Sequence, residues 1–262
     1  MTFVGDTLIG YLRFYETRNK KMKKRSNIIR LILMAMMIAL GVVISPILRV
    51  EGMCPMAHFI NVTCAVLLGP WEALICAVII GLIRMLAMGI PPLALTGAIF
   101  GAFFSGLLYR LSKGKLLAAM LGEIFGTGIV GAVISYPVMK FIWGRDGLTW
   151  FFYVPSFIAG TLIGGSIAFA FLRKIAQNGQ LERFQSQLGS EVYAGKSTLI
   201  GNGIAIASVG VIGYVVINIV CGMFRLESVI ITYISRGILL AFILIALIYV
   251  GVKKFGKTDF PD

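Results

Sequence analysis

A few polar side chains inside long apolar stretches are the residues of this chain best suited to chemistry. His58 and Asn61 lie about one helical turn apart in one apolar run, and Arg84 lies in the next. Ionisable and amide groups are costly inside a bilayer, so such residues are functional candidates by default. The chain has a single histidine and contains no His-Glu-x-x-His or Gly-x-Ser-x-Gly motif. These side chains therefore suit the binding of a small polar guest better than metal or nucleophilic catalysis.

The elements that must hold these residues are membrane-spanning helices. The chain has 262 residues, of which 58% are hydrophobic and only 13% are charged. A bilayer core takes about 20 apolar residues per helix, and its backbone groups must pair internally. We therefore predict an all-α integral membrane protein. Its net charge of +13 is explained by basic residues at cytoplasmic helix ends, so no nucleic-acid partner is expected.

The apolar runs predict eight spans joined by short connections. The first six form a module at residues 28–174, which follows a basic N-terminal tail at 1–27. A polar linker at 175–197 leads to two additional C-terminal transmembrane helices within 198–252, and a short tail at 253–262 ends the chain. The spans are expected at residues 28–48, 57–69, 71–88, 93–109, 116–142, 150–172, 198–221 and 229–252.

The distribution of basic residues predicts the orientation of these spans. With both termini in the cytoplasm, eight spans leave all but six of the 24 Lys and Arg residues on the cytoplasmic side, as the positive-inside rule favours. We therefore expect a multi-pass protein of the cell membrane. The six exceptions are Arg49, Arg84, Lys140, Arg145, Arg225 and Arg236.

The same topology places most of the intramembrane polar and aromatic residues in the outer half of the bilayer. This shared depth predicts an outward-facing pocket with polar anchors and aromatic walls. Glu123 falls in the inner third of its span, where it either bonds a neighbouring helix or takes part in coupling. The predicted pocket residues are His58, Asn61, Arg84, Thr96, Tyr136, Trp150 and Tyr153.

Four of these residues also have a purely structural interpretation. His58 suits a packing role, Arg84 suits snorkelling or pairing with Glu51, and Trp150 and Tyr153 suit an interfacial aromatic belt. Three Gly-x-x-x-Gly pairs, beginning at Gly97, Gly122 and Gly160, suit close packing between helices of the same chain.

Four stretches of the first six spans resemble a known family of membrane proteins, the substrate-binding S components of energy-coupling factor (ECF) transporters. Within that family the resemblance is closest to the ThiW group. The four stretches match the family in both their order along the chain and their spacing. The stretches are Pro-Met-Ala-His-Phe-Ile-Asn-Val at 55–62, Ala-Val-Leu-Leu-Gly-Pro-Trp at 65–71, residues 101–110 ending in Gly-Leu-Leu-Tyr-Arg, and Gly-Glu-Ile-Phe-Gly-Thr-Gly at 122–128 with Ser-Tyr-Pro at 135–137.

The resemblance implies a six-helix module that captures a vitamin precursor, in the ThiW group hydroxyethylthiazole. It implies partners as well: a transmembrane coupling protein and two ATPase subunits that use ATP, with no cofactor in this chain. Ala35 and Ala39, which share one face of the first span, match the family's docking contact with the coupling protein. Ala57 and Met85 depart from the family's usual Gln and Asn, so the guest is either this thiazole or a related small heteroaromatic compound.

The leading hypothesis is therefore a substrate-capture subunit and not an enzyme. One alternative is a stand-alone ion-coupled secondary transporter, for which Glu123 is the one acid deep in a span. Another is an intramembrane enzyme that uses His58 and Glu123. The different depths expected for these two residues argue against a shared reaction centre.

Overall fold

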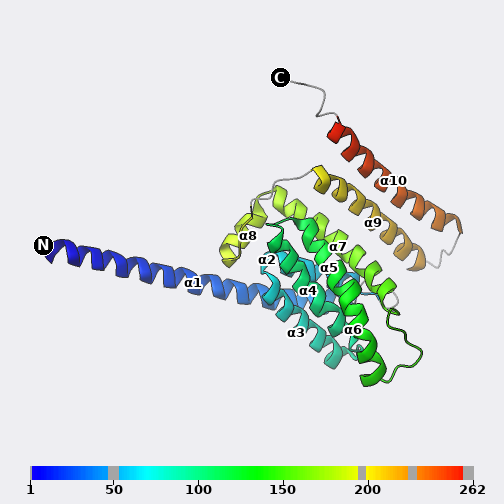
Figure 1. Ribbon diagram of the computed structural model, residues 1–262, viewed down its shortest axis with the longest axis horizontal. Coiled ribbons are helices and arrows are strands. Elements are labelled where there is room, and N and C mark those ends of the chain that lie inside the picture. Colours follow the sequence, from blue (N-terminus) through cyan, green and yellow to red (C-terminus); the bar gives the residue numbers. More distant parts are fainter. Residues whose placement is uncertain (1, 47–52, 194–198, 224–228, 256–262) are drawn as a thin grey trace.

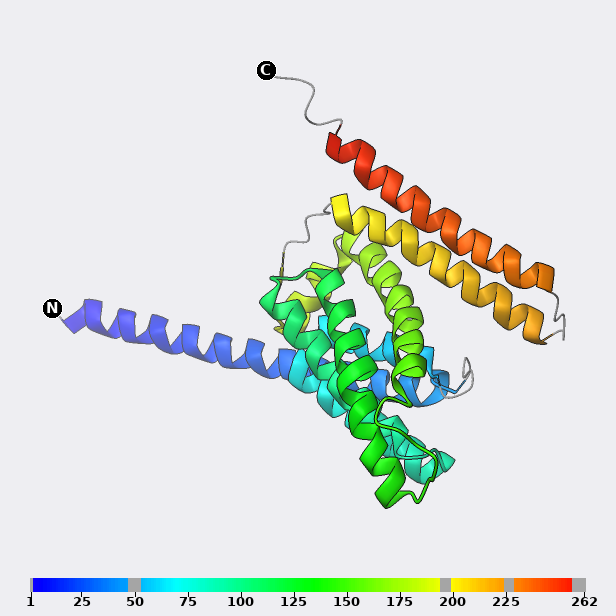
Figure 2. The same cartoon turned by 45° about the vertical axis from the view of Figure 1, so that its right-hand side comes forward.

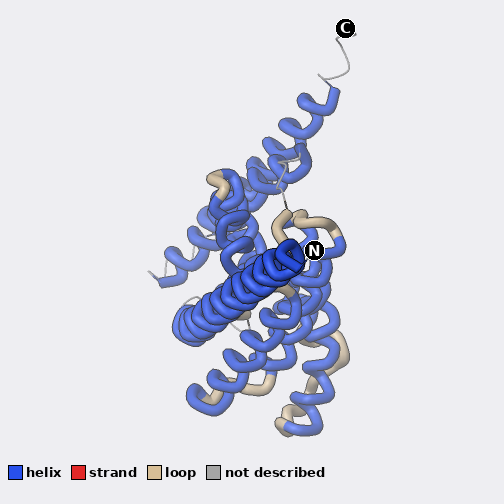
Figure 3. Tube along the Cα trace, turned by 90° about the vertical axis from the view of Figure 1, so that its left-hand side faces the viewer, coloured by secondary structure: helices blue, strands red, loops and turns tan. Residues whose placement is uncertain are grey.

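The structure is a computed structural model that describes residues 2–46, 53–193, 199–223 and 229–255. Every regular element in these ranges is a helix (Figures 1 and 3), which confirms the predicted all-α membrane protein. Six helices within the described residues are long and apolar enough to cross a bilayer. They are Met22–Ile44, Pro70–Met88, Leu93–Leu111, Leu116–Ile142, Val154–Gln177 and Val229–Lys253.

The first helix, α1 (Thr2–Ile44), is longer than its predicted span because it includes the whole basic tail. Figures 1 and 2 show this N-terminal part extending away from the bundle. The predicted end of the span at 47–48 lies outside the described residues. Three antiparallel helices follow in the order α2 (Pro55–Leu67), α3 (Pro70–Met88) and α4 (Leu93–Leu111).

Proline and glycine set the ends of these helices. Pro55 and Pro70 occupy first-turn positions, where a missing N–H costs no hydrogen bond. Gly69 has φ +107°, which permits the tight corner between α2 and α3. α2 has only 13 residues, which is too short to cross the membrane unaided.

The predicted span at 116–142 is one helical rod with two wider turns. It consists of α5 (Leu116–Phe125), the π-helical turn η1 (Gly126–Gly131), α6 (Ala132–Pro137) and a second π-helical turn, η2 (Val138–Ile142). Three glycines within η1 weaken its preference for a regular α-helix, and π-helical turns often occur at functional sites. Of the two turns, η1 begins three residues after Glu123.

The next helix, α7 (Val154–Gln177), begins later than predicted because Pro155 lies in its first turn. Trp150 and Tyr153 therefore lie in the connection before it. The predicted linker contains a further helix, α8 (Gln180–Leu188), which buries Leu181, Gln185 and Leu188 against the end of the bundle.

The C-terminal helices α9 (Leu199–Met223) and α10 (Val229–Phe255) form a hairpin, and α9 packs on α7 (Figures 1 and 2). The last residues of the predicted linker lie outside the described part of the chain, and so does Thr198, the predicted start of the first of the two C-terminal spans. The hairpin leaves much of α10 exposed, as expected for a lipid-facing surface.

Glycine contacts confirm that the small-residue motifs pack helices of the same chain. A Cβ on Gly122 or Gly126 would lie 2.4 or 2.3 Å from the α4 carbonyl oxygens of Phe104 and Phe100. A Cβ on Gly164 of α7 would lie 2.0 Å from the Pro55 carbonyl oxygen on α2. These close backbone approaches fix the positions of α2, α4, α5 and α7 around one interior.

Candidate functional site

A cavity of about 540 Å³ lies at the end of the bundle where α2, α4 and α7 begin and α3 ends. Side chains from η1 and from the connection before α7 complete its wall. Its volume falls within the range of sites for small molecules. The lining residues are Met53, Cys54, Ala57, His58, Arg84, Ile90, Pro91, Leu93, Ala94, Gly97, Ala98, Thr127, Arg145, Phe152, Tyr153, Pro155, Ser156 and Phe157.

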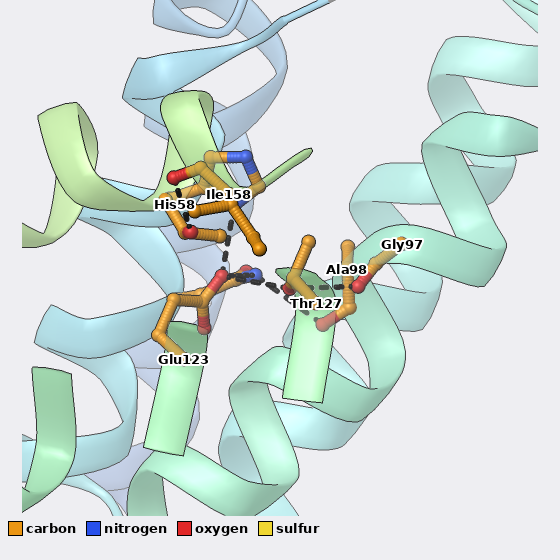
Figure 4. A network of polar contacts seen from close by, with 8 residues as sticks. His58, Gly97, Ala98, Glu123, Thr127 and Ile158 are labelled. Atoms are coloured by element: carbon orange, nitrogen blue, oxygen red, sulfur yellow. Dashed lines mark hydrogen bonds and ion pairs between the residues drawn. The ribbon is translucent and has the colours of Figure 1, made fainter. Parts of the chain in front are cut away.

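His58 joins the cavity to a buried polar network (Figure 4). Its Nδ1 lies 2.8 Å from Oε1 of Glu123, a carboxyl group that is fully buried. The same oxygen accepts a hydrogen bond from Asn61 Nδ2 at 3.1 Å and lies 3.0 Å from Thr127 Oγ1. Three elements, α2, α5 and η1, thus meet at one carboxyl oxygen. The other carboxyl oxygen, Oε2, has no hydrogen-bond partner in the described structure.

The contact between His58 and Glu123 contradicts the expectation that they lie at different depths. The error comes from the length of α2. His58 stands nine residues before the end of α2 at Leu67, and Glu123 stands seven after the start of α5 at Leu116. At 1.5 Å per residue both are about 10–14 Å from the same end of the bundle. The depth argument against a shared centre is therefore wrong.

Arg84 is buried in the cavity wall, with 4% of its surface exposed. Its Nη2 donates to Cys54 Sγ at 3.1 Å, and its Nε has no hydrogen-bond partner in the described structure. This burial excludes snorkelling for Arg84. The other structural interpretation, pairing with Glu51, lies outside the described residues.

Aromatic rings from the connection before α7 and from its first turn form another wall of the cavity. Tyr153 packs between Phe152 and Phe157, with ring centroids 5.1 and 5.8 Å apart. Arg145 stacks over Phe152 at 5.8 Å. The Tyr153 hydroxyl is buried without a hydrogen-bond partner in the described structure. The wall therefore offers ring faces together with a free hydroxyl group.

Four of the seven predicted pocket residues do not line the cavity. Asn61 lies behind His58 and also donates to the Ala98 carbonyl at 3.3 Å. Thr96 turns toward α6, where its hydroxyl lies 2.6 Å from Ser135 Oγ. Tyr136 is buried against Trp150, with centroids 4.6 Å apart, and Trp150 is 54% exposed. These residues support the wall or the connection that carries Tyr153.

Several lining residues were missed by the sequence analysis. Arg145 and Phe152 lie in an irregular connection, where no helical periodicity indicates which side chains point inward. Thr127 had a usable signal, because it follows Glu123 by four residues and so shares its helix face. Of the two departures from the family pattern, Ala57 lines the cavity and Met85 is not among the lining residues.

A helical membrane bundle with polar anchors and aromatic walls around one small-molecule cavity has the features of a membrane solute-binding or transport protein. The chain belongs to the ThiW family, because residues 31–178 match the family described as thiamine-precursor transporter protein (ThiW). The matched region contains every residue that lines the cavity. No curated protein and no solved structure matches the chain.

Proposed function

We propose that this protein is the substrate-capture subunit of an ECF-type importer and that its cavity binds hydroxyethylthiazole or a related heteroaromatic precursor of thiamine. Membership of a thiamine-precursor transporter family supports this function. The observation that carries it is the combination, in one cavity, of ring faces with the buried polar groups of His58, Arg84 and Tyr153. Ring faces bind a flat heteroaromatic guest, and the polar groups orient it.

The proposed orientation places both termini in the cytoplasm and opens the cavity to the outside. The end of the bundle opposite the cavity supports it, because Arg110, Lys113 and Lys115 gather there, near α8. Basic residues favour the cytoplasmic side.

Energy for uptake would come from ATP, hydrolysed by two partner ATPase subunits that act through a transmembrane coupling protein. The proposed docking contact is made by Ala35 and Ala39 on α1. Both are exposed, on a helix that also exposes Leu31, Ile32, Met36 and Leu40. Small residues on such an apolar face let a partner helix approach closely.

Binding to the purified protein, measured by calorimetry with hydroxyethylthiazole, tests the capture function. We expect saturable binding by the natural chain and much weaker binding by His58→Ala. Absence of binding by the natural chain would overturn the proposal. Equal binding by both proteins would remove His58 from the site.

One observation favours a second candidate, proton-coupled transport without partners. The His58–Glu123 pair at the cavity wall is a group able to hold a proton deep in the membrane. Reconstitution in liposomes distinguishes the two candidates. ECF-type transport requires the coupling protein, both ATPases and ATP, whereas uptake driven by a pH gradient in liposomes that contain this chain alone would establish the second.

A further inference from the structure

We propose that Glu123 is a positioning residue that determines which nitrogen of His58 carries the proton. The Nε2 lone pair then faces the cavity and selects a guest that donates a hydrogen bond, such as an alcohol. This inference rests on the proposed function only in placing the guest within the cavity. It assigns a role to the guest's hydroxyl group, and it assigns Glu123 a part in recognition without contact with the guest.

The first step is that Oε1 of Glu123 acts as an acceptor. Asn61 Nδ2 lies 3.1 Å from this oxygen and 3.3 Å from the Ala98 carbonyl. A carbonyl oxygen only accepts hydrogen bonds, so the nitrogen of the Asn61 amide must face this way. Its two hydrogens are then directed at Ala98 and at Oε1 of Glu123.

The second step follows at His58. A carboxylate oxygen only accepts, so beside the Glu123 carboxylate the Nδ1 atom 2.8 Å away carries the hydrogen of that contact. A neutral imidazole has one N–H, so its Nε2 then carries a lone pair. A Cβ on Gly160 would lie 3.2 Å from Nε2, so this edge of the ring lies close to α7 at a position where glycine leaves room for it. His58 lines the cavity, and in this arrangement Nε2 is the ring nitrogen left to accept a hydrogen bond from a guest.

The third step is the rigidity of this arrangement. Glu123 is completely buried, and a Cβ on Gly101 would lie 2.6 Å from each of its carboxyl oxygens. The carboxyl group thus fills a space that only glycine leaves open. Carboxylates that hold the second nitrogen of a histidine fix its tautomer and ring orientation in the same way at other functional sites.

The polarity of the cavity follows from these steps. His58 Nε2 accepts on one wall, while Arg84 Nε and the Tyr153 hydroxyl are buried groups without partners in the described structure. Arg84 can only donate. The cavity therefore suits a small heteroaromatic guest that has a hydroxyl donor at one end and an acceptor, such as a ring nitrogen, elsewhere. A guest without the hydroxyl hydrogen would leave a buried acceptor unpaired.

Three related probes test the polarity in the natural protein. They are hydroxyethylthiazole, its ethyl analogue without the hydroxyl, and its methyl ether, which keeps the oxygen but cannot donate. We expect the alcohol to bind roughly ten- to a hundred-fold more tightly than the other two. Equal binding of all three, or tight binding of the ether, would overturn the inference and leave the capture function standing. Failure of all three to bind would instead overturn the capture function.

Variants of Glu123 test its part separately. Glu123→Gln keeps a carbonyl oxygen that accepts from Nδ1, so it should retain the preference for the alcohol. Glu123→Leu removes the acceptor, so the preference over the ethyl analogue should fall to about two-fold or less, while binding of the ethyl analogue shows that the variant is folded. An unchanged preference in Glu123→Leu would contradict the positioning role.

A spectroscopic test needs no variant. The chain has a single histidine, so histidine labelled with heavy nitrogen reports on His58 alone when the protein is purified without a histidine tag. We expect nitrogen resonances of a neutral ring with a protonated Nδ1 and an unprotonated Nε2. The opposite tautomer, or a ring with both nitrogens protonated, would overturn the inference even if Glu123→Leu failed to fold.

Discussion

The two ends of the bundle hold an arginine side chain in different ways, one partly buried and one buried. At the end opposite the cavity, Arg30 of α1 bonds the Glu72 carboxylate at 2.6 Å and the Leu68 carbonyl at 3.0 Å. At the cavity end, the one hydrogen bond that the Arg84 side chain makes to a described residue goes to the weak acceptor Cys54 Sγ. An arginine with strong acceptors on neighbouring helices joins those helices, whereas a buried arginine at a cavity with one weak acceptor is available to a guest.

The same contrast extends to the neighbouring residues. Gln185 of α8 donates to the Val66 carbonyl at 2.9 Å and to the Tyr109 hydroxyl at 3.1 Å, which holds α8 on the bundle. Tyr153 at the other end has no such partner among the described residues. Polar residues opposite the cavity should therefore affect stability, and those around the cavity should affect binding.

The largest effect should come from filling the space beside Glu123. The Cβ of Gly101→Ala would overlap Thr127 Oγ1 and both carboxyl oxygens of Glu123, so the network must move. We expect a loss of stability of about 1–3 kcal/mol and a binding constant weakened roughly a hundred-fold or more. Thermal melting and calorimetry with the thiazole measure the two effects.

Gly106→Ala is the matched control for this substitution. Its Cβ would lie 2.6 Å from Pro70 Cα, so it overpacks the same helix, α4, toward the other end. It should lose similar stability and keep normal binding in the folded fraction. Equal loss of binding in both variants would mean that the cavity and the opposite end are not separable.

An intermediate effect is expected at the two arginines. Arg84→Met keeps the length of the side chain but removes the charged donors, so binding should weaken about ten- to a hundred-fold with little change in melting temperature. Arg30→Met should do the reverse, because it leaves the Leu68 carbonyl and Glu72 without their partner. A large loss of stability in Arg84→Met alone would show that Arg84 is a structural residue.

The division between the cavity end and the opposite end of the bundle can largely be predicted from the sequence, for a physical reason. Apolar runs of bilayer length specify the spans, and the basic residues between them specify which helix ends lie together. The convergence of His58, Arg84 and Tyr153 at one end follows from that order alone. The contact of His58 with Glu123 could not be predicted in this way. It arises because α2 is short, so that His58 lies at the same depth in the bundle as Glu123.

Other parts of the site depend on geometry that no periodic pattern contains. Arg145 and Phe152 reach the cavity from an irregular connection. Tyr136 and Trp150 have the right depth but pack on each other, because depth alone does not specify the direction in which a side chain points. Prediction from depth therefore selects the correct end of the bundle more reliably than the correct residues.

The smallest effects are expected from removing the hydroxyl groups of Tyr153 and Tyr109, which differ in their hydrogen-bond partners. Tyr153→Phe removes a hydroxyl that has no partner in the described structure, so it should leave stability unchanged and weaken binding about ten-fold at most. Tyr109→Phe removes the acceptor of Gln185 and should cost about 1 kcal/mol of stability without changing binding. Melting curves and titrations of both variants measure this difference. If Tyr153→Phe changed stability and not binding, the hydroxyl would belong to the framework of the bundle, and the guest would be held by His58 and Arg84 alone.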